Sequence, residues 1–187
     1  MAKKPAKDFS NINAVFLDRD GVINRKAPHG AYVVSWGDFD FLPGVERAIV
    51  SLNASQRKVI VVSNQRAIAL GLMSESDLWA IQENLNTHLA SFGAHLDAVY
   101  YCPHDYSQCN CRKPATGLFE RAFKEFPEIC PANSVMIGDS YSDILAGASM
   151  RMRTIFIANG SNPDSRSVEL ADGSANSLAE AVGTYLL

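Results

Sequence analysis

The sequence predicts an α/β protein built on a doubly wound, Rossmann-like parallel sheet with helices on both faces. Short apolar runs, each bounded by polar or turn-forming residues, recur along the chain, as expected of strands that are covered on both faces. Between them lie segments whose apolar residues repeat with the helical period. Strands that alternate with helices favour a parallel sheet whose strands all end at one edge. The predicted strands are residues 15–17, 58–65, 97–101, 134–139 and 154–157.

The predicted helices follow from apolar spacing and from start signals. Pro43-Gly44 precedes a helix with Val45, Ala48, Ile49 and Leu52 on one face. Ser74 and Asp77 resemble a capping box, which begins a second helix. Further helices are expected at 117–126, after residue 139 and at 177–182. By contrast, residues 1–12 are expected to be a flexible arm, and residues 24–36 a loop that is placed to cover a ligand.

Length and composition favour a single domain that spans residues 1–187 and can bury a core without disulfides. A hydrophobic content of 47% and a charged content of 20% are ordinary for a globular protein. The net charge of −3 argues against a broad basic surface for nucleic acid or anionic membranes. The sequence has no apolar run of signal-peptide or membrane-spanning length, so we expect a cytoplasmic protein. With no evident apolar seam, we expect a monomer.

Two carboxylates, Asp18 and Asp20, follow the first predicted strand directly, and Gly21 provides a turn. At the carboxyl end of a parallel strand they would open into the crevice where ligands bind. Two acids so close repel each other unless a cation neutralises them, so the pair indicates a hard metal ion such as Mg²⁺. Taken alone, the pair is equally typical of a capped turn.

The other strand ends supply groups that complement this pair. Ser63 and Asn64 end the second strand, Arg112 and Lys113 follow the third, and Asp139 ends the fourth. Acids, a hydroxyl, an amide and two cations at one edge indicate a metal-assisted site for an anion, with phosphate as the candidate. An ordinary set of turn residues would not require this combination.

Phosphate chemistry assigns a task to each of these side chains. One acid must attack phosphorus and the other must move the proton. Asp139 would complete the Mg²⁺ ligands, and Asp143, one helical turn on, would support them. Ser63 and Asn64 would donate hydrogen bonds to the phosphoryl oxygens. Lys113 would offset the charge of the attacking carboxylate and the phosphate, a role that suits an ammonium group.

In chain order the strand ends carry Asp18-Arg19-Asp20-Gly21-Val22, Ser63, Lys113 and Gly138-Asp139-Ser140-Tyr141-Ser142-Asp143. These stretches resemble the four motifs of the haloacid dehalogenase-like phosphohydrolases, and the resemblance covers residues 14–160. It implies that Asp18 is the nucleophile and Asp20 the acid/base. It also implies that Mg²⁺ is held by Asp18, by the backbone carbonyl of Asp20 and by Asp139. The chain length leaves room only for a minimal cap.

A cluster of soft ligands follows the third strand. Three thiolates and an imidazole within ten residues match the ligand count of a closed tetrahedral Zn²⁺ site, although their spacing is tighter than in zinc fingers. Free thiols beside a surface histidine are the alternative. A closed site predicts a structural zinc that directs Arg112 and Lys113 toward the substrate, with Arg112 as a bidentate substrate clamp. The expected ligands, in a loop over residues 102–111, are Cys102, His104, Cys109 and Cys111.

The zinc loop narrows the resemblance within the superfamily. Cys-Pro-His, Cys-x-Cys-Arg-Lys-Pro, Asp-Arg-Asp-Gly-Val-Ile and Ser-Asn-Gln look like the D-glycero-D-manno-heptose 1,7-bisphosphate phosphatases and the histidinol-phosphate phosphatases. Both groups hydrolyse a small phosphomonoester with Mg²⁺ and carry a zinc loop. Residues 22–23 and 113–118 lean toward the heptose enzymes, which implies removal of the 7-phosphate.

Two features leave the substrate open at this stage. After Ser63-Asn64-Gln65 the family commonly has a small residue, Gly, Ile and an Arg before Gly, whereas this chain has Arg66-Ala67-Ile68-Ala69-Leu70-Gly71. The zinc loop is also short, closer to the histidinol-phosphate type, so that substrate and other small phosphorylated metabolites remain alternatives. A non-catalytic zinc or phospho-ligand binding module is a further alternative. The intact Asp20 argues against it, because a binding module needs no second acid.

Overall fold

A single six-stranded sheet organises the computed structural model, which describes residues 8–160 and 165–187. All neighbouring strands pair in parallel, in the order β3-β2-β1-β4-β5-β6. The predicted fold class is therefore confirmed. The strands are β1 (Ala14–Leu17), β2 (Lys58–Asn64), β3 (Ala98–Cys102), β4 (Ser134–Gly138), β5 (Arg153–Ile157) and β6 (Gly173–Ala175).

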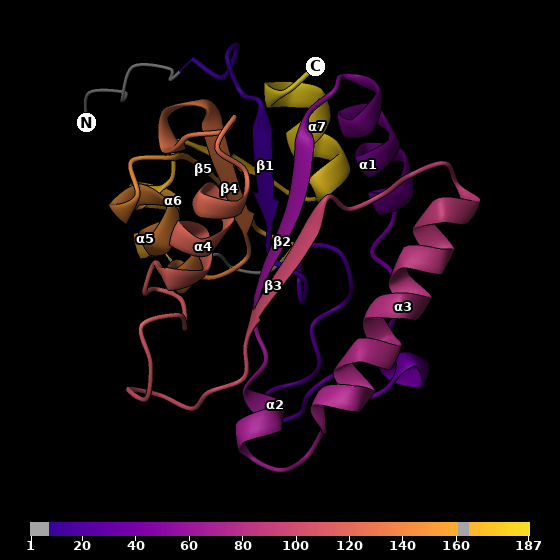
Figure 1. The fold of residues 1–187 in the computed structure, drawn as a ribbon. Helices are drawn as coiled ribbons and strands as arrows, with labels where there is room; N and C mark the ends of the chain where they lie inside the picture. Colours follow the sequence, from indigo (N-terminus) through magenta and orange to yellow (C-terminus); the bar gives the residue numbers. More distant parts are fainter. Residues whose placement is uncertain (1–7, 161–164) are drawn as a thin grey trace.

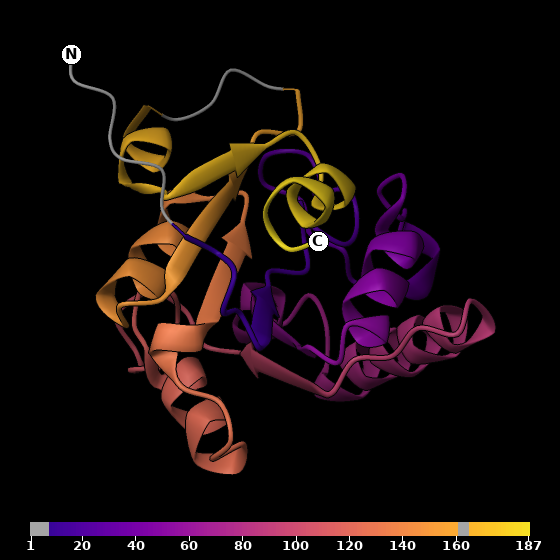
Figure 2. The same cartoon turned by 90° about the horizontal axis from the view of Figure 1, so that it is seen from above.

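Helices cover both faces of the sheet, as Figures 1 and 2 show. One face carries α1, α3 and α7, and the other carries α4, α5 and α6. The short helix α2 follows β2 at the edge where the strands end. Of the described helices, none is long and apolar enough to cross a membrane. Their bounds are α1 (Val45–Ala54), α2 (Arg66–Ala69), α3 (Glu75–Ser91), α4 (Gly117–Glu125), α5 (Tyr141–Ser149), α6 (Ser165–Leu170) and α7 (Leu178–Tyr185), with 3₁₀ turns η1 (Trp36–Asp38) and η2 (Pro131–Asn133).

The two faces of β1 divide the core. Val15 and Leu17 pack in the cluster under α1, α3 and α7, whereas Phe16 packs under α4 against Phe119. Successive strand residues point to opposite faces, so a strand covered on both sides must be apolar throughout. All four residues of β1 are buried. The continuous apolar run that the sequence shows is thus the direct consequence of its central place.

Strand register brings the predicted site residues to one edge. Leu17 lies opposite Val61 of β2 and Ile137 of β4. The residues that follow these positions therefore lie at a common level, which includes Asp18 and Asp139. Helix α3 begins at the predicted capping box, where the Ser74 side chain accepts a hydrogen bond from the Asp77 backbone N–H.

The structure differs from the sequence prediction at the periphery. The flexible arm was expected over 1–12; residues 1–7 lie outside the described residues, and the prediction is wrong for 8–12, because Phe9 and Ile12 are buried. The ring of Phe9 contacts Tyr185 at 4.9 Å between centroids. The sequence does not predict helices α2 and α6 or strand β6, because each is short. The cap, the part of the chain that lies over the edge where the strands end, is minimal, because the segments that follow β1 (18–44) and β3 (103–116) contain no α-helix.

Candidate active site and Cys/His cluster

Three of the predicted carboxylates meet at the edge of the sheet. One carboxylate oxygen from each of Asp18, Asp139 and Asp143 lies within 4.8 Å of the other two. They come from the end of β1, the end of β4 and the first turn of α5. Gly21 makes room for them: its φ is +96°, and a Cβ atom there would lie 2.1 Å from Asp139 Oδ2. A side chain at position 21 would therefore collide with the cluster.

Lys113 is the buried cation of this cluster. Its side chain is 1% exposed, and Nζ lies 3.0 Å from Asp18 Oδ1 and 2.7 Å from Asp143 Oδ1. Nζ also donates a hydrogen bond to the Val62 carbonyl at 2.7 Å. Burial opposes the charge on this ammonium, but Asp143 and Asp18 outweigh burial and raise the pKa of Lys113. The group stays protonated and links the end of β1 to α5.

Negative charge nevertheless exceeds positive charge at this point. Burial, followed by repulsion from Asp143, raises the pKa of Asp18 to about 7, although Lys113 opposes the rise. Burial also raises the pKa of Asp139, in spite of the ammonium of Lys26, which lies 3.0 Å away. Carboxylates in such surroundings are stabilised by a divalent cation, and oxygen ligands suit Mg²⁺. The residues present therefore fit the predicted metal.

Lys26 is a site residue that sequence reasoning missed. It lies in the loop after β1, six positions beyond Asp20, and its Nζ is within 3.1 Å of both carboxylate oxygens of Asp139. Charge attraction raises the pKa of Lys26 although burial opposes it. A lone lysine in a loop carries no motif, so only the folded chain shows this contact.

Asp20 is held by three donors and stands apart from the carboxylate cluster. The Arg19 guanidinium donates to both of its oxygens at 3.0 Å. Asn24 Nδ2 donates to Oδ1 at 2.9 Å, and Gln65 Nε2 donates to Oδ2 at 3.1 Å. Arg19 is 2% exposed, so its charge is desolvated and strongly tied to Asp20. The sequence predicted Asp20 but not these three supports.

Ser63 and Asn64 lie near the end of β2, as predicted, but their side chains make hydrogen bonds with Gln65 and Lys113. Ser63 is buried, and its hydroxyl accepts a hydrogen bond from Gln65 Nε2 at 2.7 Å. The Asn64 amide donates to the Lys113 carbonyl at 3.1 Å and accepts from the Lys113 backbone N–H at 3.0 Å. This two-way contact gives Asn64 a positioning role toward Lys113. Its predicted contact with substrate remains a prediction.

A cavity of about 450 Å³ opens over the carboxylates. Asp18, Asp20 and Asp143 line it at one end, and residues 26–33 of the loop after β1 form part of its wall. The prediction that residues 24–36 lie over a ligand site agrees with this arrangement. The remaining polar wall is formed by Ser63, Asn64, Gln65, Arg66, Tyr106, Arg112, Ser140 and Ser142.

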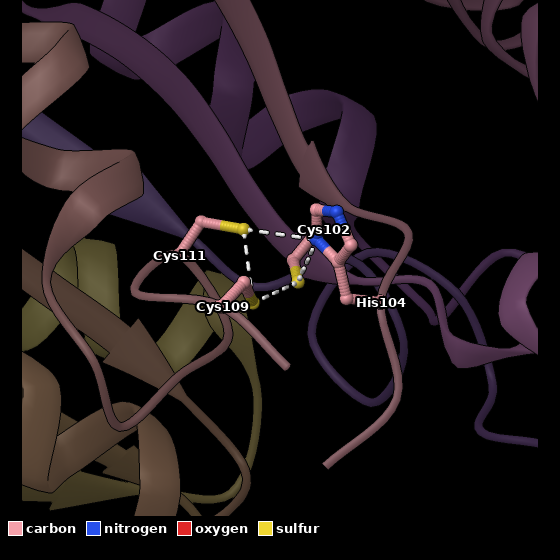
Figure 3. A group of neighbouring side chains, drawn as sticks. All are labelled: Cys102, His104, Cys109 and Cys111. Carbon is pink, nitrogen blue, oxygen red and sulfur yellow. Dashed lines mark hydrogen bonds between the residues drawn. The ribbon is translucent and has the colours of Figure 1, made fainter. Parts of the chain in front are cut away.

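The four predicted soft ligands converge at the end of β3, which supplies Cys102, and in the loop after it (Figure 3). Cys102 Sγ lies 3.5 Å from Cys109 Sγ and 3.6 Å from His104 Nδ1. Cys111 Sγ lies 3.3 Å from Cys109 Sγ and 3.4 Å from His104 Nδ1. Ligands at about 2.0–2.3 Å from a tetrahedral Zn²⁺ are separated by about 3.3–3.8 Å. The donor set and its spacing therefore fit zinc.

The thiols of this cluster differ in acidity. Burial opposes ionisation of Cys109, but hydrogen bonds from the Cys111 side chain and backbone prevail and lower its pKa to about 6. Burial raises the pKa of Cys102 and of Cys111. A metal ligand must be a thiolate, so metal binding here would release the protons of these thiols.

Comparison with known proteins agrees with this geometry. The family model described as HAD-hydrolase-like matches residues 110–181. A D-glycero-alpha-D-manno-heptose-1,7-bisphosphate 7-phosphatase from Mycobacterium tuberculosis (strain H37Rv) is 44% identical over 131 residues, which cover 70% of this chain and 68% of that protein. The D-glycero-beta-D-manno-heptose-1,7-bisphosphate 7-phosphatase of Haemophilus ducreyi is 38% identical over 178 residues, which cover 90% and 96%.

Solved structures give the same result. The D,D-heptose 1,7-bisphosphate phosphatase of B. bronchiseptica, crystallised with magnesium and phosphate, has a TM-score of 0.81 and 28% sequence identity, and the match covers 94% of this chain and 98% of that one. The corresponding enzyme of Burkholderia thailandensis has a TM-score of 0.65 and 27% identity, over 93% and 98%. The chain therefore belongs to the haloacid dehalogenase-like hydrolases, within the group that contains the heptose-1,7-bisphosphate 7-phosphatases.

Proposed function

We propose that this protein is a Mg²⁺-dependent phosphatase that removes the 7-phosphate of a D-glycero-D-manno-heptose 1,7-bisphosphate. The observation that carries the proposal is the buried ion-pair chain at the cavity floor, in which Lys113 joins Asp18 to Asp143. A buried ammonium beside a carboxylate that faces a cavity holds that carboxylate in place for attack and offsets its charge. The names of the relatives supply the sugar.

In the first half of the reaction, Asp18 attacks the 7-phosphorus. A bond forms between the Asp18 carboxylate oxygen and phosphorus while the bond from phosphorus to the sugar oxygen breaks. Asp20, in its protonated form, gives its proton to the departing sugar oxygen. Lys113, 3.0 Å from Asp18 Oδ1, stabilises the negative charge that gathers around the phosphoryl group. The product on the enzyme is an aspartyl phosphate at Asp18.

In the second half, water regenerates Asp18. Asp20 is now a carboxylate and takes a proton from the water whose oxygen attacks phosphorus. The bond between phosphorus and Asp18 breaks, and inorganic phosphate leaves. Arg19, Asn24 and Gln65 hold Asp20 in one orientation through both halves. The Ser63 hydroxyl, at the end of β2, is proposed to donate to a phosphoryl oxygen.

The two metals would have separate tasks. Mg²⁺, held by Asp18, the Asp20 carbonyl and Asp139 with Asp143 in support, supplies charge neutralisation between the phosphate and the carboxylates. Zinc held by Cys102, His104, Cys109 and Cys111 would have four protein ligands and no free position for water, so its role would be structural. The zinc loop then fixes Arg112 at the cavity wall, where its guanidinium binds substrate.

Phosphate release from a small panel tests the proposal. Both anomers of heptose 1,7-bisphosphate, histidinol phosphate and common sugar phosphates are compared with and without Mg²⁺. We expect the heptose bisphosphates to be the best substrates, and Asp18→Asn to lower turnover by at least about a thousandfold. The matched control is Asp97→Asn, because Asp97 is also ion-paired to a lysine, Lys58, but lies outside the cavity lining.

Several results would contradict the proposal. Turnover that survives Asp18→Asn would exclude the covalent mechanism. A preference for histidinol phosphate would keep the chemistry and replace the substrate. Binding of sugar phosphates with no release from any member of the panel would favour a non-catalytic binding module.

A further inference from the structure

The ring of Tyr106 contacts two arginines on the cavity wall. The guanidinium carbon of Arg66, the first residue of α2, lies 4.6 Å from the ring centroid, and that of Arg112 lies 4.5 Å from it. Guanidinium groups at this distance are attracted by the electron-rich face of the ring. All three residues line the cavity. One aromatic ring thus holds two cations in the same wall, where substrate binds.

Arg66 is fixed by further contacts to two other segments. Its Nε and Nη2 donate to the two carboxylate oxygens of Asp105 at 2.6 Å and 3.2 Å, and its Nη1 donates to the Tyr32 hydroxyl at 3.3 Å. The hydrogen bonds from Arg66 are the main cause of the lowered pKa of Asp105. Arg66 therefore connects α2, the zinc loop and the loop after β1. Its guanidinium donates hydrogen bonds to side chains of the protein itself.

Arg112 is held by fewer interactions with the protein than Arg66 is. Its Nη1 donates to the His104 carbonyl at 3.4 Å, a long hydrogen bond that uses one of the five N–H donors of a guanidinium. Its other support is the ring of Tyr106. The orientation of Arg112 thus depends on the orientation of Tyr106, which is 64% exposed and would turn freely without a second partner.

We propose that Arg66 is a positioning residue: acting through Tyr106, it aims Arg112 at the phosphate that is not cleaved, and so makes the enzyme prefer a bisphosphate to a monophosphate. This inference rests on the proposed function, in which the substrate carries two phosphates. Charge favours it. Arg66 and Arg112 line this wall, and Asp105, the carboxylate that pairs with Arg66, does not line the cavity, whereas carboxylates predominate where the first phosphate reacts. A planar fork binds phosphate in bidentate fashion.

The test compares heptose 1,7-bisphosphate with heptose 7-phosphate, which share the cleaved group. In Arg66→Ser we expect KM for the bisphosphate to rise on the order of tenfold, the factor that corresponds to about 1.4 kcal/mol. KM for the 7-phosphate and kcat for both substrates should change by less than about twofold. Tyr106→Leu should give the same selective loss, and the double variant should add little to either single variant.

Two comparisons separate positioning from general damage. Arg66→Lys keeps the charge but loses the planar fork, so it should recover only part of the selectivity. Arg121→Ser is the matched control. Arg121 lies on α4, outside the cavity lining, but it is also ion-paired to a carboxylate, Glu125, and lies over a tyrosine ring, that of Tyr100. It should leave both KM values unchanged.

The possible failures are distinct. An equal rise of KM for both substrates, or no rise for either, would overturn the inference while the wild-type activity upheld the proposed function. Complete recovery in Arg66→Lys would reduce the role of Arg66 to its charge and would also overturn it. If the wild-type enzyme released phosphate from neither heptose substrate, the proposed function would fail, and the inference with it.

Discussion

The molecule has two candidate metal sites, and they are built in opposite ways. The carboxylate cluster is assembled from distant parts of the chain, with Asp18 after β1, Lys113 after the zinc loop, and Asp139 and Asp143 around the start of α5. The Cys/His cluster lies within the single segment 102–111. The first is a product of sheet topology, which brings strand ends together. The second is a product of local spacing.

The two clusters also differ in how their charge is balanced. The carboxylates are paired with ammonium groups of the chain itself, Lys113 at 2.7–3.0 Å and Lys26 at 3.0 Å. The Cys/His cluster holds its thiols together by contacts among its own four members. We therefore expect the carboxylate cluster to keep its shape without metal, whereas the zinc loop should need its metal to keep its shape.

The largest expected effect comes from removing the internal cation of the carboxylate cluster. Lys113→Met would leave Asp18 and Asp143 without their shared buried partner. Loss of one member of a buried ion pair costs about 3–5 kcal/mol, so urea unfolding should show a decrease of that size, and phosphate release should become undetectable. Lys58→Met is the control; the Lys58 side chain is 37% exposed, and a loss below about 1 kcal/mol is expected. Equal losses in both variants would contradict the comparison.

The second effect tests the dependence of the zinc loop on its metal. Cys109→Ser, or removal of zinc by a chelator, should lower stability by about 3 kcal/mol, the value expected for loss of a ligand present at a hundred times its Kd or more. The same change should also raise KM, because Tyr106 lies within the loop and Arg112 comes directly after it, so both side chains lose their support. Thermal unfolding with metal analysis gives the measurement. Cys130→Ser, at an exposed thiol outside the cluster, should change neither value. A zinc-free protein of unchanged stability would argue against a structural zinc.

Both clusters could be predicted from the sequence, but for different reasons. Asp18, Asp20 and Asp139 follow the ends of β1 and β4 closely, and Ser63 lies near the end of β2, so the parallel sheet predicts that they reach the same edge. Lys113 comes later, after β3 and the Cys/His segment. The Cys/His ligands are close in sequence, and their chemistry indicates one metal. In both cases a residue type with restricted chemistry stands at a place that the fold determines.

The residues that the sequence could not predict act through long or flexible side chains. Lys26 reaches Asp139 from a loop without periodicity, and Gln65 turns back to Asp20 from the start of α2. Arg66 was noted only as a departure from the family pattern; its contacts with Tyr106 and Asp105 depend on how two loops pack. Burial of Phe9 likewise depends on the C-terminal helix, whose Tyr185 ring contacts it. Such contacts are set by tertiary packing, which local sequence does not encode.

The third prediction concerns the excess of negative charge in the carboxylate cluster. In the metal-free fold the pKa of Asp18 is about 7, above its ordinary value of 3.8. A raised carboxyl pKa means that the folded state binds more protons than the unfolded state between these values. The contribution of Asp18 to the stability of the metal-free protein should therefore fall as pH rises from about 4 to 7, and then level off. Asp18→Asn removes this effect, so the variant should have the higher Tm at pH 8 and no advantage at pH 4.

Chelated samples of both proteins, followed by thermal unfolding across this pH range, give the measurement. Added Mg²⁺ should restore stability to the wild type at pH 8 and much less to Asp18→Asn. A wild type whose metal-free stability rises between pH 4 and 7 relative to the variant would contradict the prediction, since Lys113 would then outweigh burial and Asp143.

The smallest expected effect distinguishes the two lysines of the carboxylate cluster. Lys26 is 56% exposed in its side chain, whereas Lys113 is 1% exposed, so Lys26 contributes little to stability. Its ammonium instead competes with Mg²⁺ for Asp139. Lys26→Met should therefore strengthen Mg²⁺ binding by about threefold in a calorimetric titration, a change of well under 1 kcal/mol. Arg25→Met, which removes a neighbouring charge paired to Asp40 on the surface, should leave Mg²⁺ affinity unchanged. Weaker Mg²⁺ binding in Lys26→Met would mean that this lysine orients Asp139 for the metal, and both lysines would then belong to the built-in framework of the site.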